Sequence, residues 1–141
     1  MYQAYVRIVL MGLKKKGKKK KRDSIDSRPK GSSRAILALR IAKSDSTFEL
    51  DVLNKRYVGK CIHCSTSLVV MSETGSTLAT IEHIVPLIAG GSGTDLMNLA
   101  LSCSRCNNQK GIHHDAKQLD DRGEFVINLL LRKRASRFRC E

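Results

Sequence analysis

The chain has 141 residues with 4% aromatic residues and no Trp, so it suits one compact domain whose core must come from Ile, Leu and Val. Its formal net charge of +13 at pH 7 favours nucleic acid, an anionic membrane surface or an acidic protein as partner. The apolar run at residues 4–13 is interrupted by Arg7, is too short to span a membrane and lacks the residue order of a secretory signal, so we expect a cytoplasmic protein with no membrane partner.

Residues 1–32 contain a strongly basic block, in which eight of the nine residues from 14 to 22 are Lys or Arg. Such a block repels itself and has nothing apolar to bury, so we expect residues 1–32 to form a disordered arm ahead of a domain at residues 33–141. The arm is either a solvated tail or a DNA-contacting segment. In the second case its phosphate contacts would be Lys14, Lys15, Lys16, Lys18, Lys19, Lys20, Lys21 and Arg22.

Two helices are predicted at the start of the folded part. Apolar residues recur at helical spacing from Ser33 to Ala42 and predict the first. The sequence Ser46-Thr-Phe-Glu49 is typical of a capping box and predicts a second helix that Gly59 would end. Its apolar stripe would consist of Phe48, Val52, Leu53 and Tyr57.

The following segments favour strands and then helices. Residues 67–71 and 77–85 are rich in Val, Ile, Thr and Leu, and the turn residues 73–76 between them predict a β-hairpin. Pro86 would stop the second strand, a Gly-rich loop would follow at residues 87–95, and residues 96–102 would be extended. Helices are expected at residues 104–119 and 124–137, and the basic end of the last one offers further candidate phosphate contacts.

Four of the five cysteines lie in two Cys-x-x-Cys pairs, Cys61/Cys64 and Cys103/Cys106, while Cys140 is left over. In a cytoplasmic protein such pairs indicate metal binding rather than disulfides, with a redox role as the minor alternative. Two such knuckles supply four thiolates to one Zn²⁺ and leave no position for water, so the ion would fix geometry without taking part in catalysis. His63, between the first two cysteines, would merely fill the knuckle.

Polar side chains gather where this zinc site would hold the chain together. Glu82 and His83 end the second predicted strand, and Asn107 follows the last cysteine at the start of a helix. Neighbouring strand residues point to opposite faces, so Glu82 and His83 can serve one site only if it straddles the strand end. The alternative is an ordinary polar pair on an exposed strand.

These elements resemble the HNH endonucleases with a zinc-bound ββα-metal core, in the variant whose third motif residue is Asn. The resemblance covers residues 60–111 and rests on Cys-x-x-Cys, Glu-His-Ile-Val-Pro-Leu, Gly-Gly, Asn-Leu and Cys-Ser-Arg-Cys-Asn-Asn-Gln-Lys-Gly in that order. It implies an α+β fold, in which this small core, with a structural zinc held by four cysteines, is flanked by N- and C-terminal helices and a basic N-terminal tail. It also implies hydrolysis of double-stranded DNA to 5′-phosphate and 3′-hydroxyl ends.

The resemblance also implies residue roles. His83 would be the general base, Asn98 would hold the loop by hydrogen bonds, and Asn107 with Glu82 would bind one catalytic Mg²⁺ or Mn²⁺. An imidazole, which titrates near pH ~6.5, can accept a proton from water, and a hard cation can stabilise the leaving oxygen. Arg105 and Lys110 would add positive charge for the phosphate, or would be ordinary solvated side chains.

Two other readings stay open at this stage. A non-catalytic zinc module that binds nucleic acid through its basic tails would explain the charge and the cysteines, but not the coexistence of Glu82, His83 and Asn107. Alternatively, the chain could be a nuclease subunit that needs a protein partner, as in a phage packaging or restriction complex.

Overall fold

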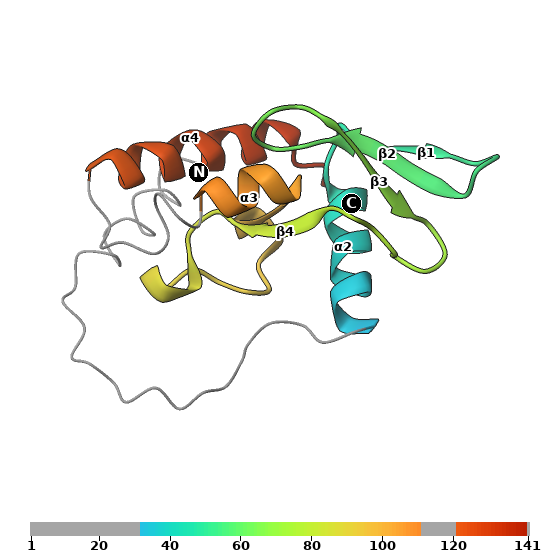
Figure 1. The fold of residues 1–141 in the computed structure, drawn as a ribbon, viewed down its shortest axis with the longest axis horizontal. Helices are drawn as coiled ribbons and strands as arrows, with labels where there is room; N and C mark the ends of the chain where they lie inside the picture. Colours follow the sequence, from blue (N-terminus) through green and yellow to red (C-terminus); the bar gives the residue numbers. More distant parts are fainter. Residues whose placement is uncertain (1–31, 111–120, 141) are drawn as a thin grey trace.

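The computed structural model describes residues 32–110 and 121–140, and these form a mixed α+β structure (Figure 1). The predicted arm therefore lies almost wholly outside the described residues. The helices are α2 (Ser32–Ser44), α3 (Ser104–Lys110) and α4 (Asp121–Arg137), and the short 3-10 turns are η1 (Leu87–Ala89) and η2 (Leu96–Asn98). The strands are β1 (Glu49–Asp51), β2 (Arg56–Lys60), β3 (Ser67–Met71), β4 (Thr80–His83) and β5 (Leu99–Ser102).

The strands form two small antiparallel sheets. One has the order β1-β2-β3, and the other pairs β4 with β5 so that His83 lies opposite Leu99. Because α3 follows β5 directly, β4, β5 and α3 make a strand–strand–helix unit, in agreement with the α+β expectation. The β1–β2 hairpin extends away from this unit, while α4 passes along one side of it (Figure 1).

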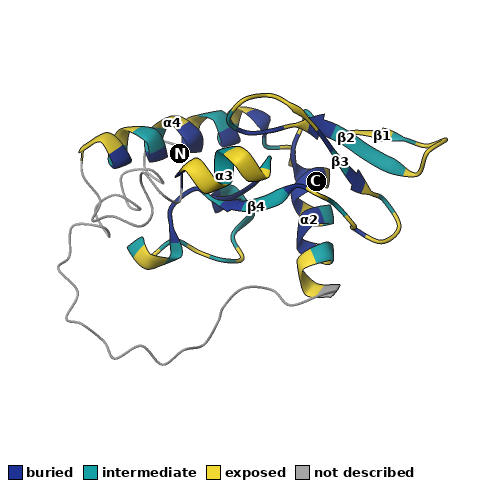
Figure 2. Ribbon diagram, in the orientation of Figure 1, coloured by how far each residue is buried: buried dark blue, intermediate teal, exposed yellow. Residues whose placement is uncertain are grey.

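All four residues of β5 are buried, so this strand belongs to the core, and Figure 2 shows that α2 and α4 also carry buried residues. Alternate side chains of a strand point to opposite faces, and those of β5 enter two different clusters. Leu99 and Leu101 pack in the cluster that holds the apolar residues of α2, whereas Ala100 packs with Ile127 and Leu131 of α4. Burying one such Leu stabilises the fold by about 1.5–3 kcal/mol, so β5 ties the two helices to the second sheet.

The C-terminal ends of α2 and α4 meet around a fully buried guanidinium. Arg134 of α4 is 0% exposed, donates 2.6 Å to Ser44 Oγ, and lies 3.7 Å from the Asp45 carboxylate and 5.1 Å from the centroid of the Phe138 ring. Its Nε and Nη2 also donate to Leu96 O, each at 3.1 Å. Arg134 thus joins α2, η2 and α4.

The helix expected at residues 46–59 is wrong, because this segment forms β1, a turn and β2. Phe48 is 0% exposed whereas Leu53 is 94% exposed, so the supposed apolar stripe is split between core and solvent. A Cβ at Gly59 would lie 2.3 Å from the Phe48 ring, which shows that the ring packs directly on the β2 backbone. The Asp51 carboxylate accepts from Asn54 N at 3.2 Å and stabilises the turn, a local contact that competes with helix formation.

The hairpin expected between residues 67–71 and 77–85 is also wrong, since β3 pairs with β2 and β4 pairs with β5. After β3 the turn packs on α2, where Gly75 has a φ of +70° and a Cβ would lie 2.2 Å from Ala35 O. The chain then crosses to the other sheet. A turn-rich sequence between two strands thus predicted the turn but not the partner of each strand.

The other expected elements agree better with the structure. The first helix, the start of the helix at residue 104 and the last helix are confirmed as α2, α3 and α4, although the expected residues 111–119 lie outside the described ranges. The extended segment at residues 96–102 begins with η2 and continues as β5. Within residues 32–110 and 121–140, no helix combines the length and apolar character needed to cross a membrane.

Candidate metal centre and strand-end site

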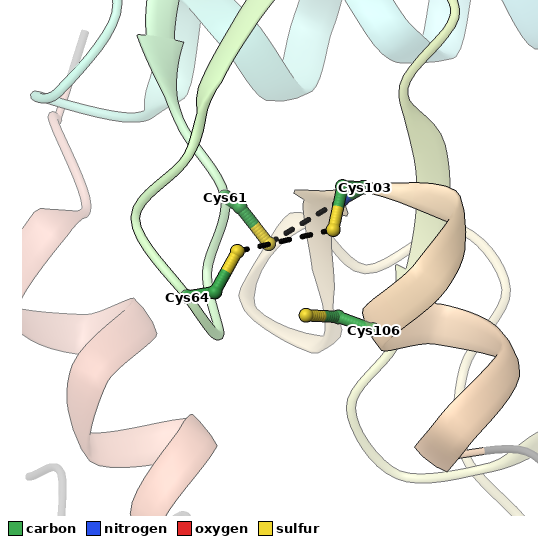
Figure 3. Close-up of side chains that lie close together, drawn as sticks. All are labelled: Cys61, Cys64, Cys103 and Cys106. Carbon is green, nitrogen blue, oxygen red and sulfur yellow. Dashed lines mark hydrogen bonds between the residues drawn. The ribbon is translucent and has the colours of Figure 1, made fainter.

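Four cysteine side chains converge from two parts of the chain, as predicted. The Sγ atoms of Cys61, Cys64, Cys103 and Cys106 all lie within 4.8 Å of one another. Figure 3 shows the first pair on the loop after β2 and the second pair at the start of α3, with the sulfurs pointing toward a common centre.

The spacing of the sulfurs fits a tetrahedral zinc ion. Thiolates at the usual Zn–S distance of about 2.3 Å have S···S edges of about 3.8 Å. The Sγ atoms of Cys64 and Cys103 are 3.9 Å apart, and Cys103 N donates 3.3 Å to Cys61 Sγ, which favours a thiolate there. The cluster can therefore hold a metal such as zinc with all four positions filled by sulfur.

Two of the thiols have strongly altered acidity. Hydrogen bonds from the side chain and backbone of Thr66 lower the pKa of Cys64 to about 6. Burial raises the pKa of Cys106 to about 12, and the neighbouring thiols raise it further. A pKa of about 6 favours the Cys64 thiolate at neutral pH, whereas Cys106 depends on a nearby cation to lose its proton.

The first knuckle is anchored to the rest of the fold through its backbone. Ile62 N donates 3.1 Å to Leu101 O of β5, and Lys133 Nζ donates 3.2 Å to His63 O. Arg137 Nη1 donates to the carbonyls of Lys60 and Cys61 at 3.2 and 3.4 Å.

These contacts correct the expectation that the whole basic end of α4 is available to phosphate. Arg134 and Arg137 are 0% and 9% exposed and turn inward, and burial next to Arg137 lowers the pKa of Lys133. Arg132 and Arg139 remain exposed.

Glu82 on β4 is fully buried, contrary to the alternative of a polar pair on an exposed strand. Its Oε2 lies 3.2 Å from His63 Nε2 and its Oε1 lies 2.8 Å from Lys110 Nζ. The Oε1–Lys110 contact is close enough for an ion pair, yet Oε1 accepts no aligned hydrogen bond. Coulomb attraction at this distance does not depend on the donor angle, so Lys110 and Glu82 form an ion pair. The position beside Oε1 therefore stabilises a cation, which in this structure is the Lys110 ammonium.

Lys110 does not occupy the surface position expected of a phosphate contact. Lys110 is only 4% exposed. Its Nζ also donates to His83 O at 3.1 Å, so Lys110 connects α3 to the end of β4. Arg105, in contrast, is exposed on α3.

His83 and Asn107 belong to the two elements that this contact joins, β4 and α3. His83 is half-buried at the end of β4, and its Nε2 is 4.0 Å from where a Cβ of Gly93 would be. Asn107 precedes Lys110 by three residues on α3, and residues at this spacing share one helix face. The half-buried Asn107 is therefore on the side of α3 that meets β4.

Asn98 holds the loop between β4 and β5. Its Oδ1 accepts from Val85 N at 2.8 Å, and its Nδ2 donates to Val85 O at 3.1 Å and to Ser92 O at 2.8 Å. A Cβ at Gly91 would lie 1.9 Å from Val85 O, so only glycine allows this close approach. The side chain is buried and makes the contacts that a loop-holding amide would make.

Strands β4 and β5 and helix α3 form a small α+β unit next to four cysteines that can hold a metal ion, and polar side chains lie at the end of β4. Residues 61–112 of the chain, which contain this unit, match the family model described as HNH endonuclease. The match indicates nuclease-type activity on nucleic acid. Comparisons with curated proteins and with solved structures gave no match.

Sequence reasoning missed three residues of this region. His63 was expected only to fill the knuckle, but it contacts Glu82, and Lys133 and Arg137 anchor the knuckle instead of facing solvent. The sequence offered one signal, a titratable side chain inside a Cys-x-x-Cys pair. It contained no signal for the lysine and arginine, whose partners are 70 or more residues away.

Proposed function

We propose that the protein is a metal-dependent DNA endonuclease that hydrolyses phosphodiester bonds at the C-terminal end of β4. The observation that carries the proposal is that the HNH endonuclease match falls on the strand–strand–helix unit that carries Glu82, His83 and Asn107. A non-catalytic zinc module would not need a fully buried carboxylate next to a histidine at the end of a strand.

His83 is the general base of the proposed reaction. Its Nε2 faces Gly93, and a residue without a side chain leaves room for a phosphate and an attacking water next to the imidazole. Lys110 fixes the His83 carbonyl, and Asn98 fixes Val85 two residues further on, so the backbone at and just after the histidine is held. Such fixation favours a defined orientation of the base.

Glu82 and Asn107 are the residues that would hold the catalytic ion, Mg²⁺ or Mn²⁺. The observation supporting this fit is the buried Glu82 Oε1, which accepts no hydrogen bond and already has a cationic neighbour. When bound, the ion would supply positive charge to the phosphate and to the leaving oxygen. The amide of Asn107 would add a neutral oxygen ligand from the adjoining face of α3.

The exposed Arg105 on α3 and the basic residues 14–22 are proposed to contact the DNA backbone. Phosphate contacts of this kind raise affinity without reading sequence, and they weaken as salt increases.

The experiment is a plasmid-nicking assay with zinc-loaded protein in Mg²⁺ or Mn²⁺, comparing the wild type with His83→Ala. We expect cleavage by the wild type and a loss of at least 100-fold in the variant, the usual effect of removing a general base. Equal zinc content and circular dichroism would show that both proteins are folded, and Cys140→Ser serves as a control outside the site. Cleavage by His83→Ala at the wild-type rate would refute the role of His83. Salt-sensitive DNA binding without cleavage in any divalent ion would support the non-catalytic zinc module.

A further inference from the structure

We propose that His63, inside the first cysteine knuckle, is a positioning residue that orients Glu82 toward the catalytic ion and so links the two metal sites. The inference rests on the proposed function, because it concerns the ion that Glu82 would bind there. The observation behind it is the contact of 3.2 Å between His63 Nε2 and Glu82 Oε2 across 19 residues of sequence.

The two oxygens of the Glu82 carboxylate have different neighbours. Oε2 faces the imidazole, while Oε1 forms an ion pair with Lys110 Nζ at 2.8 Å but accepts no aligned hydrogen bond. A carboxylate held at one oxygen by a neutral donor keeps its charge and presents the other oxygen in a fixed direction. His63 acts in this way when Nε2 carries the proton.

The His63 ring is itself held firmly. His63 lies between Cys61 and Cys64 of the four-cysteine cluster. The neighbouring Ile62 N donates a hydrogen bond to β5, and His63 O accepts one from Lys133. Only 19% of the His63 side chain is exposed. Zinc at the cysteines would therefore fix the knuckle, the knuckle would fix His63, and His63 would fix the carboxylate that binds the second ion.

A purely structural pair makes a different prediction. If His63 only compensated a buried charge, removing it would lower the stability of the protein but would leave the ion affinity of the folded molecule unchanged. If His63 orients Glu82, removing it should weaken ion binding by about 10–100-fold, the usual effect of losing such an outer partner.

The test measures Mn²⁺ binding directly, by electron paramagnetic resonance of zinc-loaded protein, and nicking separately. Three variants are compared: His63→Ala, His63→Gln, whose amide nitrogen can replace Nε2, and His63→Asn, whose amide is too short. We expect zinc content to be retained, Mn²⁺ affinity to fall at least tenfold in the Ala and Asn variants, and the Gln variant to recover most of it. In nicking, the Mn²⁺ concentration for half-maximal rate should rise, with kcat at saturating Mn²⁺ changed much less.

Arg132→Met is the matched control, because Arg132 is exposed on α4 next to Lys133 and no contact among the described residues joins it to the knuckle; its Mn²⁺ affinity should stay within about twofold of wild type. Mn²⁺ affinity within twofold of wild type in both His63→Ala and His63→Asn would overturn this inference and leave the proposed nuclease site standing. A wild-type protein that binds no Mn²⁺ would overturn the proposed ion site, and this inference with it. If His63→Ala loses zinc, the comparison of the Gln and Asn variants decides.

Discussion

Replacing Arg134 by Met should destabilise the protein strongly, although the residue has no part in the proposed chemistry. The substitution keeps an unbranched side chain in the same space but removes the guanidinium from between Asp45, Ser44 and Leu96. Asp45 is 1% exposed, so its carboxylate would stay buried without a cation.

The magnitude follows from what each group loses. Breaking a buried ion pair by removing one partner costs about 3–5 kcal/mol. We expect a value near the lower end, about 3 kcal/mol, because the Arg134–Asp45 contact is long at 3.7 Å and Thr47 still donates twice to Asp45 Oδ1. Burial lowers the pKa of Arg134, although Asp45 opposes that shift; the side chain nevertheless stays charged in the neutral range.

The assay is urea unfolding of zinc-saturated protein followed by circular dichroism, with Arg132→Met as the exposed control on the same helix. The control should change the free energy of unfolding by less than about 0.5 kcal/mol. Adding Asp45→Asn to Arg134→Met removes the unpaired charge, so the double variant should lose about 0.5–3 kcal/mol less than the sum of the single losses. A loss below about 1 kcal/mol for Arg134→Met, or strict additivity in the cycle, would refute the view that this charge pair joins the helices.

Three further outcomes can be checked. Zinc binding at pH 7.5 should displace a full proton from Cys106, whose pKa is raised to about 12, and almost none from Cys64, whose pKa is lowered to about 6. At pH 5 the number of protons released should increase by nearly one and the zinc affinity should fall, which calorimetry in buffers of different ionisation enthalpy can measure. Lys110→Met should tighten Mn²⁺ binding several-fold by removing a competing cation from Glu82, with an unchanged salt dependence of DNA binding; a flattened salt dependence would restore Lys110 as a phosphate contact. Asn98→Ala should lower the free energy of unfolding by about 1–3 kcal/mol, because it leaves buried backbone groups unpaired, and the nicking rate of the folded variant should fall more than tenfold. Nicking at the wild-type rate would show that the loop does not need the Asn98 side chain.

The cysteine cluster could be predicted because its signal is local, whereas the strand–strand–helix unit was implied only by the resemblance to a known family. Each Cys-x-x-Cys pair supplies two ligands within one turn, but the strand patterns did not show that β4 pairs with β5 and not with β3. The same locality explains the failure at residues 46–59. A capping-box pattern describes a helix start, but the packing of Phe48 on Gly59 depends on two strands being side by side, and the apolar stripe does not encode that contact.

The inward direction of the basic residues in α4 could not be predicted for a related reason. A run of Arg and Lys in a basic chain indicates solvent or phosphate when it is considered alone. Its burial depends on acceptors from distant segments, such as Ser44, which is 90 residues from Arg134, and Lys60, which is 77 residues from Arg137. Charge composition predicts the partner of the whole molecule better than it predicts the role of one arginine.

The proposed site is fixed from three sides by contacts that are all long-range, and this has a consequence for the zinc. Arg134 holds Leu96 two residues before Asn98, the knuckle binds β5 through Ile62, and His63 reaches Glu82. A zinc ion bound by four thiolates takes no part in catalysis. Two of these three contacts, those of Ile62 and His63, nevertheless start from the cysteine loop that the ion would close. Loss of zinc should therefore loosen Glu82 before it unfolds α2 or α4, because those helices are joined independently through Arg134.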